Sequence, residues 1–467
     1  MSLCQSVTSV RRAVAALSLA ACVSLCHIST CALAQSEITK LVPPDAAAID
    51  HFGCSLALCG DVALVGAYRH DPLGIHDAGA AYVYRFDGAQ WHQQQKLFAC
   101  VPDSSACFGC AVDLDGDTAL IGAAGDDDFG ELSGSAYIFR FDGSDWTQHQ
   151  KLLPSEPAPD TWFGRTVALA GDLAVIGADG FLAFPHYAGA AYVFRNNGST
   201  WVEEAKLEPA DGDGNDRFGC ALALNDEFIF VGAIQNGGSV ASPGAAYVFR
   251  YDGLHWIQHQ KLVPADAEHG DLFGWSVALH DDFAFIAAPK NDETALDAGA
   301  VYCYSFDGSA WCQRQKLLFP DGKTGDWLGS ALAPGDERLL VGAHGVSDCR
   351  GAACVFTFDQ SSWVAENRIF ASDGLAEDRF GEAVALDGEL ILVGASFHDA
   401  ADFNAGAAYA FAFCPADINV DGIVDVLDLL KVLAHWGQSG EASDITGDGI
   451  VDVLDLLEVL ASWGPCP

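Results

Sequence analysis

Two acidic loops near the C-terminus contain the residue types best suited to binding a metal ion. Both follow a twelve-position pattern with oxygen-bearing side chains at positions 1, 3, 5, 9 and 12, glycine at position 6 and a backbone carbonyl at position 7. Hard oxygen donors in this number suit calcium, so we predict two bound Ca2+ ions. The predicted ligands are Asp417, Asn419, Asp421, Ile423, Asp425 and Asp428 in the first loop and Asp444, Thr446, Asp448, Ile450, Asp452 and Asp455 in the second.

An apolar helix is expected after each loop, because Val-Leu-Asp-Leu-Leu follows both. We predict helices over Val426 to His435 and over Val453 to Ser462. No amphipathic helix precedes either loop, so the paired helices of calcium sensors are not expected. The duplicated EF-hand loop and helix resembles a type I dockerin, a module that docks cargo onto cohesin-bearing partners. The resemblance implies a protein partner, cohesin-like or an envelope scaffold, that contacts the two helices.

Loop positions 10 and 11 depart from the dockerin pattern. Polar residues are usual there, whereas the first loop has Val426 and Leu427 and the second has the same pair. These residues could contact a partner, pack on the rest of the chain, or form a small core with Trp436 and Trp463. Since the acidic loops repel themselves without a counter-ion, we expect calcium removal to unfold residues 414–467 and to leave the rest folded.

The preceding part of the chain is a repeat with a period of about 55 residues. Each copy begins with Phe-Gly or Leu-Gly, continues with a small-residue motif such as Val-Gly-Ala, and then has a strand of the Gly-Ala-Ala-Tyr-Val-Phe type. Seven copies of each motif occur in a fixed order. The first motif begins at Phe52, Phe108, Phe163, Phe218, Phe273, Leu328 and Phe380.

Each unit is predicted to hold four short strands bounded by turn residues. In the first unit they cover residues 52–58, 62–67, 79–86 and 91–97. Four strands repeated seven times predict a seven-bladed β-propeller, and a helical solenoid is excluded because no unit has a long helical periodicity. We therefore expect a mainly β chain, with a propeller over residues 35–413 and a small α-helical module of two calcium loops over residues 414–467.

The fourth-strand motif predicts how the ring closes. Trp followed by Lys-Leu marks the fourth strand, with Arg368-Ile369 as a variant in the sixth unit, and the seventh unit has no such strand after Phe411. A matching Lys-Leu segment stands alone at residues 37–41. We predict that this segment pairs with Ala407 to Phe413 as the missing strand of the last blade.

These units resemble the FG-GAP repeats of the integrin α-chain propeller, and the resemblance covers Glu37 to Phe413. Integrin repeats often carry a calcium loop of the form DxDxDGxxD after the Phe-Gly strand. Here that place holds tight turns such as Asp113 to Asp117, so the resemblance implies no calcium in the propeller.

Cysteine spacing suggests several disulfides and no reactive centre. The pairings we expect are Cys414 with Cys466, Cys303 with Cys312 across a hairpin turn at Asp307-Gly308, Cys349 with Cys354, and Cys100 with Cys107 or Cys110. Cys54, Cys110 and Cys220 follow Phe-Gly at equivalent positions, where other units have Arg165, Trp275, Ser330 and Glu382. We interpret these three cysteines as small buried residues, not as a catalytic or zinc set.

Residues 1–34 have the features of an export signal, with Arg11 and Arg12, an apolar run and a small-residue cleavage site at Ala32-Leu33-Ala34. A secreted or cell-surface protein is expected; a lipid anchor at Cys22 is the minority interpretation. No later segment is long enough for a transmembrane helix. The net charge of −41 argues against nucleic acid and anionic membranes as partners.

Three functions fit these patterns. The first is a secreted, non-enzymatic binding or adhesion propeller, tethered through the calcium-dependent module, with a glycan or protein ligand on the face formed by the long loops after the small-residue motifs. The second is a carbohydrate-active protein of polysaccharide breakdown, acting as a hydrolase or lyase. The third is a structural repeat protein whose module is only a calcium-stabilised cap. We predict no catalytic residue, because the candidate acids and histidines recur in several units.

Overall fold

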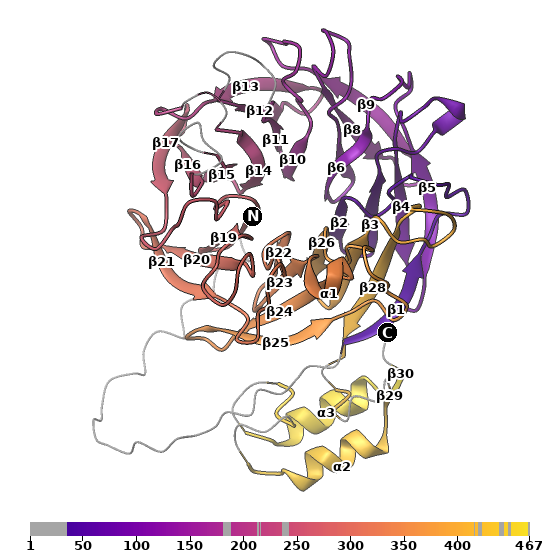
Figure 1. The fold of residues 1–467 in the computed structure, drawn as a ribbon. Helices are drawn as coiled ribbons and strands as arrows, with labels where there is room; N and C mark the ends of the chain where they lie inside the picture. The colour runs from indigo at the N-terminus through magenta and orange to yellow at the C-terminus, as the bar shows by residue number, and fades with distance from the viewer. Residues whose placement is uncertain are drawn as a thin grey trace, which may run out of the picture.

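Seven four-stranded antiparallel sheets form a closed ring in the computed structural model (Figure 1). The structure describes residues 35–180, 188–212, 214, 216–235, 242–414, 416–418, 423–438, 443–446 and 450–465. The predicted seven-bladed propeller is confirmed. The predicted leader, residues 1–34, lies outside the described residues. Within the described part, no helix is both long and apolar enough to span a bilayer.

In each blade the first strand lies nearest the ring axis and the fourth strand lies outermost; in the last blade β1 takes the fourth place. The strands nearest the axis are β2 (Leu56–Cys59), β6 (Phe108–Asp115), β10 (Thr166–Ala170), β14 (Phe218–Leu224), β18 (Val277–His280), β22 (Leu332–Pro334) and β26 (Val384–Asp387). The second strands are β3 (Val62–Ala67), β7 (Thr118–Ala123), β11 (Leu173–Ala178), β15 (Phe228–Ala233), β19 (Phe283–Ala288), β23 (Arg338–Ala343) and β27 (Leu390–Ala395).

The third strands are β4 (Ala80–Phe86), β8 (Ser135–Phe141), β12 (Ala190–Asn196), β16 (Ala245–Tyr251), β20 (Ala300–Phe306), β24 (Ala352–Phe358) and β28 (Ala407–Phe413). The outer strands are β5 (Trp91–Leu97), β9 (Trp146–Leu152), β13 (Trp201–Leu207), β17 (Trp256–Leu262), β21 (Trp311–Leu317), β25 (Trp363–Ile369) and β1 (Gln35–Leu41). Two short helices, η1 (Pro72–Gly74) and α1 (Val346–Cys349), lie in loops.

The core lies between the blades. Strands such as β3 are buried along their whole length, because each blade packs both faces against its neighbours. The Phe of each Phe-Gly pair lies in this interface; Phe52, for example, meets the edge of Tyr82 with ring centroids 5.5 Å apart. The following glycine allows the blades to approach. A Cβ on Gly109, whose φ is +88°, would lie 2.3 Å from the carbonyl oxygen of Ala80 in the preceding blade.

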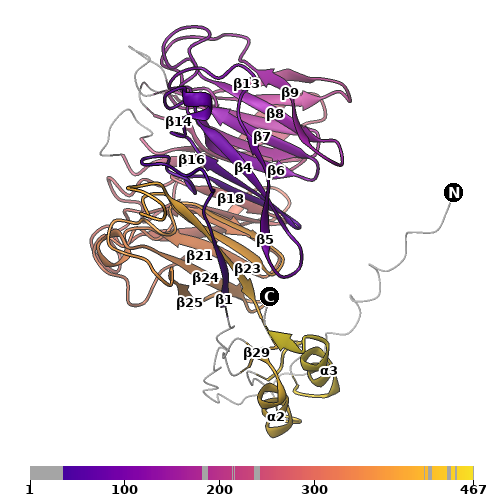
Figure 2. The ribbon, with the colours of Figure 1, turned by 90° about the vertical axis from the view of Figure 1, so that its right-hand side faces the viewer.

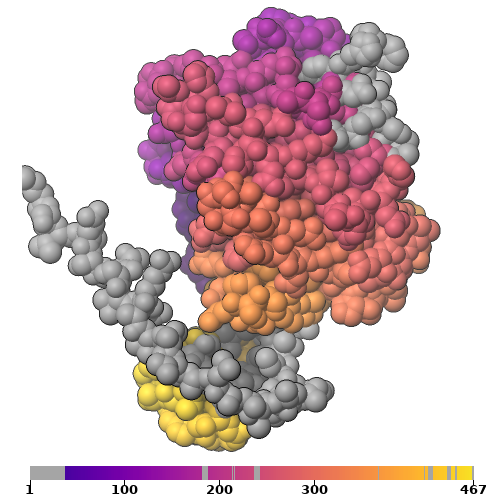
Figure 3. Space-filling model, turned by 90° about the vertical axis from the view of Figure 1, so that its left-hand side faces the viewer, coloured from indigo at the N-terminus to yellow at the C-terminus, as the bar shows by residue number. Residues whose placement is uncertain are grey.

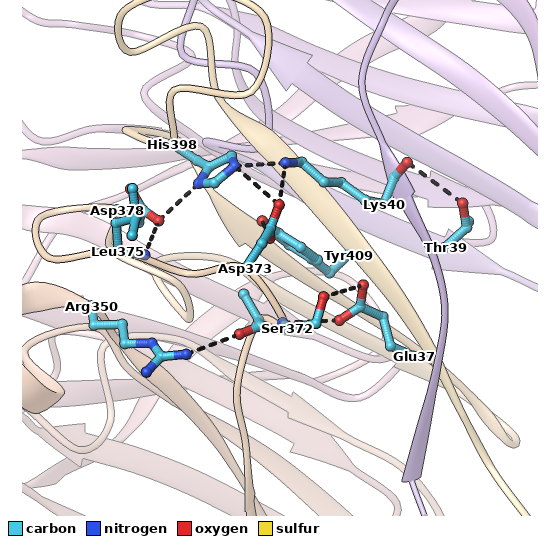
Figure 4. Close-up of polar contacts among 11 residues, drawn as sticks. Glu37, Thr39, Lys40, Arg350, Ser372, Asp373, Leu375, Asp378, His398 and Tyr409 are labelled. Carbon is cyan, nitrogen blue, oxygen red and sulfur yellow. Dashed lines mark hydrogen bonds and ion pairs between the residues drawn. The ribbon is translucent and has the colours of Figure 1, made fainter. Parts of the chain in front are cut away.

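The ring is closed by the N-terminal strand, as predicted. β1 pairs antiparallel with β28 in a register that places Lys40 opposite Tyr409 (Figures 1 and 2). Figure 4 shows the polar contacts that fix this seam. The Lys40 ammonium lies 2.8 Å from Asp373, and the Tyr409 hydroxyl donates to the same carboxylate at 2.7 Å. Lys40 also donates to His398, whose other ring nitrogen lies 2.8 Å from Asp378.

The seam repeats a contact found in other blades. Lys96 and Tyr82 of the first blade meet Asp45, which lies in the loop after β1, at 2.8 Å and 3.1 Å. The hydrogen bonds from Lys40 and Tyr409 outweigh the opposing effect of partial burial and lower the pKa of Asp373 to about 2. The loop after β1 is therefore joined to the first blade by the same Lys-Tyr-Asp contact that joins the loop after β25 to the last blade.

The C-terminal residues form a separate small module. It contains α2 (Val426–Ala434), α3 (Val453–Ala461) and the short pair β29 (Ile423–Val424) and β30 (Gly464–Pro465). The two predicted helices are confirmed. The module's own core consists of Cys414, Ala416, Ile418, Val424, Val432, Val451 and Val459. Coloured yellow in Figures 1 and 3, the module projects from the rim of the ring.

Three of the predicted disulfides are wrong, since the cysteines concerned are free. The loop between β20 and β21 has four residues, not two, and a bulge follows, so Cys303 faces Gln315 and Cys312 faces Ser305. Cys349 lies at the axial cavity described below, whereas Cys354 lies inside a blade on β24. Cys100 lies in the loop after an outer strand, away from the cavity-lining Cys107 and Cys110. Cys414 is disulfide-bonded, and its expected partner Cys466 lies outside the described residues.

Candidate binding site on the propeller axis

A cavity of about 830 Å3 opens at one end of the ring axis and is lined by side chains from all seven blades. The residue directly after each Phe-Gly or Leu-Gly contributes to it, because these residues precede or begin the strands nearest the axis. This ring consists of Cys54, Cys110, Arg165, Cys220, Trp275, Ser330 and Glu382. A second cavity of about 430 Å3 adjoins the first and shares four of these residues. Seven equivalent backbone positions therefore carry five different side-chain chemistries.

The residues before each Phe or Leu form a second set near the axis. All seven adopt left-handed backbone conformations, with φ between 55° and 59°. They are His51, Cys107, Trp162, Arg217, Leu272, Trp327 and Arg379. Such conformations cost about 1–3 kcal/mol each and persist only where packing enforces them. Here the packed Phe or Leu of the blade interface follows directly and holds them in place.

A buried ion pair lies at the wall of the cavity. Asp179, at the end of β11, is 0% exposed, and the Arg217 guanidinium approaches its carboxylate at 2.6 Å and 3.1 Å. The other carboxylate oxygen is 3.4 Å from Nε of Arg165. A buried carboxylate needs such cationic neighbours, because leaving it unpaired away from water is costly. Arg217 is therefore occupied by Asp179.

Two further guanidinium groups stay available to the cavity. Arg165 stacks over Trp162 at 4.7 Å, and Arg379 stacks over Phe397 at 4.1 Å. Their side chains are 44% and 42% exposed. Arg379 lies 3.8 Å from Glu382, at the outer limit of an ion pair. Among the described residues, neither guanidinium donates a hydrogen bond. Both lie against an aromatic ring, line the cavity and are partly exposed to its solvent.

Aromatic rings also line the cavity. Trp275 and Trp327 meet edge to face with centroids 6.1 Å apart, and Trp327 contacts His344 at 5.2 Å. Burial and the nearby Arg379 charge lower the pKa of His344 to about 4, so this imidazole is neutral at neutral pH. Its Nδ1 atom is buried and has no hydrogen-bond partner in the described structure. All three rings are partly exposed.

The cavity thiols are poor nucleophiles. Burial raises the pKa of Cys54 and of Cys220 to about 12, which keeps both protonated at neutral pH. Burial also raises the pKa of Glu382, which accepts a hydrogen bond from Ser396 at 2.6 Å. Within the described ranges, no group of three His, Cys, Asp or Glu side chains could hold a metal ion. The arrangement is suited to binding through arginines and aromatic rings.

The predicted calcium loops are described only in part, because Asn419, Asp421 and Asp448 lie outside the described residues. Of the remaining donors, position 12 of each loop is the most informative. Asp428 and Asp455 are completely buried, and their carboxylates accept backbone N–H groups of Asp425 and Thr446 at 2.9 Å. Buried carboxylates are retained where they are hydrogen-bonded or bind a metal; these two are hydrogen-bonded, and the bound ion stays a prediction.

The other described donors lie at the same loops. Asp417 is buried, Asp444, Ile450 and the backbone of Ile423 lie in their loops, and Asp425 and Asp452 precede α2 and α3. These last two residues also act as helix N-caps, a role that the sequence analysis missed. Each accepts a hydrogen bond at 2.7 Å from the backbone N–H two residues later.

The helices present apolar residues outward. Ten such residues, five around each helix, are between 46% and 53% exposed, and they are called the helical apolar face below. They are Val426, Leu427, Leu430, Leu433 and Trp436 for α2 and Val453, Leu454, Leu457, Leu460 and Trp463 for α3. Of the three roles left open for the pairs after each loop and for the tryptophans, that of a small core is therefore wrong. Valines and isoleucine of the module form that core instead.

Comparison with known proteins agrees with the repeat. The FG-GAP repeat family matches residues 36–84, 91–139, 146–194, 201–249, 256–304, 311–356 and 363–411. Each match starts in or just before an outer strand and ends in or near the third strand of the next blade, so it crosses a blade boundary. No curated protein matches the sequence. Seven matches that together span most of the propeller place the chain in the FG-GAP repeat family.

Proposed function

We propose that this protein is a secreted, non-enzymatic binding propeller, tethered to a partner protein through a calcium-dependent, dockerin-like C-terminal module. An FG-GAP propeller suggests a binding or adhesion type of repeat protein. The tether rests on one observation, the duplicated helical apolar face. The expected partner is a cohesin-like domain or an envelope scaffold protein.

The helical apolar face has the composition of a protein interface. Eight branched aliphatic residues and two tryptophans are half exposed at α2 and α3, the two helices of the described part of the module. Soluble monomers rarely expose large contiguous apolar patches, and tryptophan is enriched among residues that dominate binding energy. Because the same five positions are used at both helices, a partner could engage either helix in the same way.

Calcium would act by folding the loops that position these helices. The two capping residues, Asp425 and Asp452, join each loop to its helix. Neutralising the clustered carboxylates would therefore stabilise both the loop and the first turn of the helix. We expect a chelator to abolish partner binding and to leave the propeller folded.

The test uses the full-length protein, immobilised, with purified cohesin domains and extracellular envelope proteins as analytes. We expect calcium-dependent capture that the double variant Leu430→Glu/Leu457→Glu weakens by at least about tenfold, because both changes place a charge in the interface. The control is Leu254→Glu, an exposed apolar residue of the propeller that is 76% exposed.

Capture that persists in the double variant would contradict the tether. Capture that persists in a chelator would contradict only its calcium dependence. If nothing is captured although calcium still raises the helical circular-dichroism signal, the module is a calcium-stabilised cap and the proposal is wrong.

A further inference from the structure

We propose that the axial cavity binds a carboxylated saccharide of the uronic-acid class, with Arg165 and Arg379 as the groups that contact its carboxylates. This inference rests on the proposed role of the propeller as the ligand-binding part, and it does not depend on the tether. The volume of about 830 Å3 lies within the usual range for small-molecule sites.

The two arginines are preorganised for an anion. Stacking on Trp162 and Phe397 fixes each guanidinium plane, so little side-chain entropy is lost when a ligand binds. Several other propeller arginines are paired more closely with carboxylates; Arg85, for example, lies 2.7 Å from Asp61. The cavity arginines have Glu382 only at 3.8 Å and Asp179 only at 3.4 Å. Their N–H groups match the planar, bidentate geometry of a carboxylate.

The charge of the whole protein makes this cavity exceptional. The chain carries a net charge of −41, so an anionic ligand is repelled by most of its surface. Three arginines meet at the cavity against two acids, and burial raises the pKa of one acid, Glu382. Arg217 is the closer partner of Asp179, at 2.6 Å against 3.4 Å for Arg165, so the three arginines together leave an excess of positive charge at the cavity. The axial cavity is therefore a local cationic site on an acidic protein.

The aromatic side of the cavity favours a sugar over an acidic peptide. Trp275 and Trp327 are partly exposed and offer apolar surface at which the CH face of a pyranose ring can pack. Ser330 and His344 also line the cavity, but the Ser330 hydroxyl donates to the carbonyl of Gly381 at 2.9 Å and Nδ1 of His344 is buried, so the arginines and tryptophans are the groups that a ligand meets. A ligand that joins a sugar ring to carboxylates uses the tryptophans and the arginines together.

The test is calorimetric titration of the full-length protein with a short oligogalacturonate. The matched ligand is its methyl-esterified form, which keeps the sugar rings and removes the charges. We expect saturable binding of the acid form, weakened about tenfold or more by esterification and by each of Arg165→Gln and Arg379→Gln. Rising salt should weaken it as well.

The control variant is Arg250→Gln. Arg250 also stacks on aromatic rings, at 5.5 Å from Phe228 and Phe306, and is 40% exposed, but it does not line the axial cavity. It should bind the oligogalacturonate like the wild type. Thermal unfolding of each variant checks that the propeller is intact.

Absence of saturable binding, equal binding of the esterified sugar, or unchanged binding by both cavity variants overturns the inference. Equal or tighter binding of oligoglutamate would keep an anion site and overturn the assignment to a saccharide. The partner capture described above is measured on the same preparations. Its failure with intact sugar binding refutes only the tether, and the converse refutes only the axial site.

Discussion

Replacing Leu41 by alanine tests whether the N-terminal strand is a full member of the last blade. Leu41 is 4% exposed and packs in a cluster that combines residues of the first and last blades, including Phe52 and Leu392. Leu→Ala in a buried site costs about 2–5 kcal/mol, from lost burial and from the cavity left behind. Several neighbours are alanines on paired strands that cannot move inward, so we expect about 3–4 kcal/mol.

The matched control is Leu207→Ala. Leu207 holds the equivalent Lys-Leu position in an interior blade and is 2% exposed. Urea unfolding followed by tryptophan fluorescence gives the midpoint and slope for each variant. If the seam is equivalent to the other blade contacts, the two losses should agree within about 1 kcal/mol. A loss below about 1 kcal/mol for Leu41→Ala, with 2–5 kcal/mol for Leu207→Ala, would refute the reasoning.

Two further predictions concern the seam and the blade contacts. Asp373→Asn should destabilise the propeller by at most about 1 kcal/mol at neutral pH, since this ion pair is half exposed. Because the folded pKa of Asp373 is lowered from 3.8 to about 2, the difference from wild type should shrink as the pH falls through this window in pH-dependent unfolding. Gly189→Ala should lower the free energy of unfolding by about 2 kcal/mol or more, as φ is +93° and a Cβ would lie 2.0 Å from a backbone carbonyl. Gly198→Ala, with the same φ and open space, should cost clearly less, and equal urea midpoints would contradict the clash.

The ring and its closure could be predicted from the spacing of the motifs. The last unit lacks an outer strand after Phe411, and an unassigned Lys-Leu segment stands at residues 37–41. The simplest arrangement is that this segment supplies the missing strand. The acids that recur two residues before Phe-Gly or Leu-Gly cap turns in the structure, which gives them a structural role. Asp50 and Asp378, for example, accept backbone N–H groups three residues earlier at 2.8 Å and 2.6 Å.

Register inside a blade could not be predicted from symmetry about a turn. The expected pairing of Cys303 with Cys312 assumed a two-residue loop at Asp307-Gly308. Asp307 instead accepts the N–H groups of Ser309 and Ala310, which closes a four-residue loop, and a bulge then shifts the pairing again. Similar shifts occur between the third and outer strands of the other interior blades. A register shift of one residue moves apart two residues that counting from the turn would place opposite each other.

The repeat alone does not indicate the axial cavity. Of the residues after each Phe-Gly or Leu-Gly, the three cysteines are interpreted from the sequence as small buried residues, because their positions are equivalent. In the structure, packing of the preceding Phe or Leu and Gly fixes the backbone there, and the next side chain lines the cavity, where its partners differ from blade to blade. Equivalent positions can then hold Cys220, Arg165 or Trp275 without disturbing a blade. In a ring of near-identical blades, some positions keep the same backbone conformation but differ in side chain. Selection for binding can act at such positions, so a difference in side chain between otherwise matching repeats is the signal to look for in the sequence.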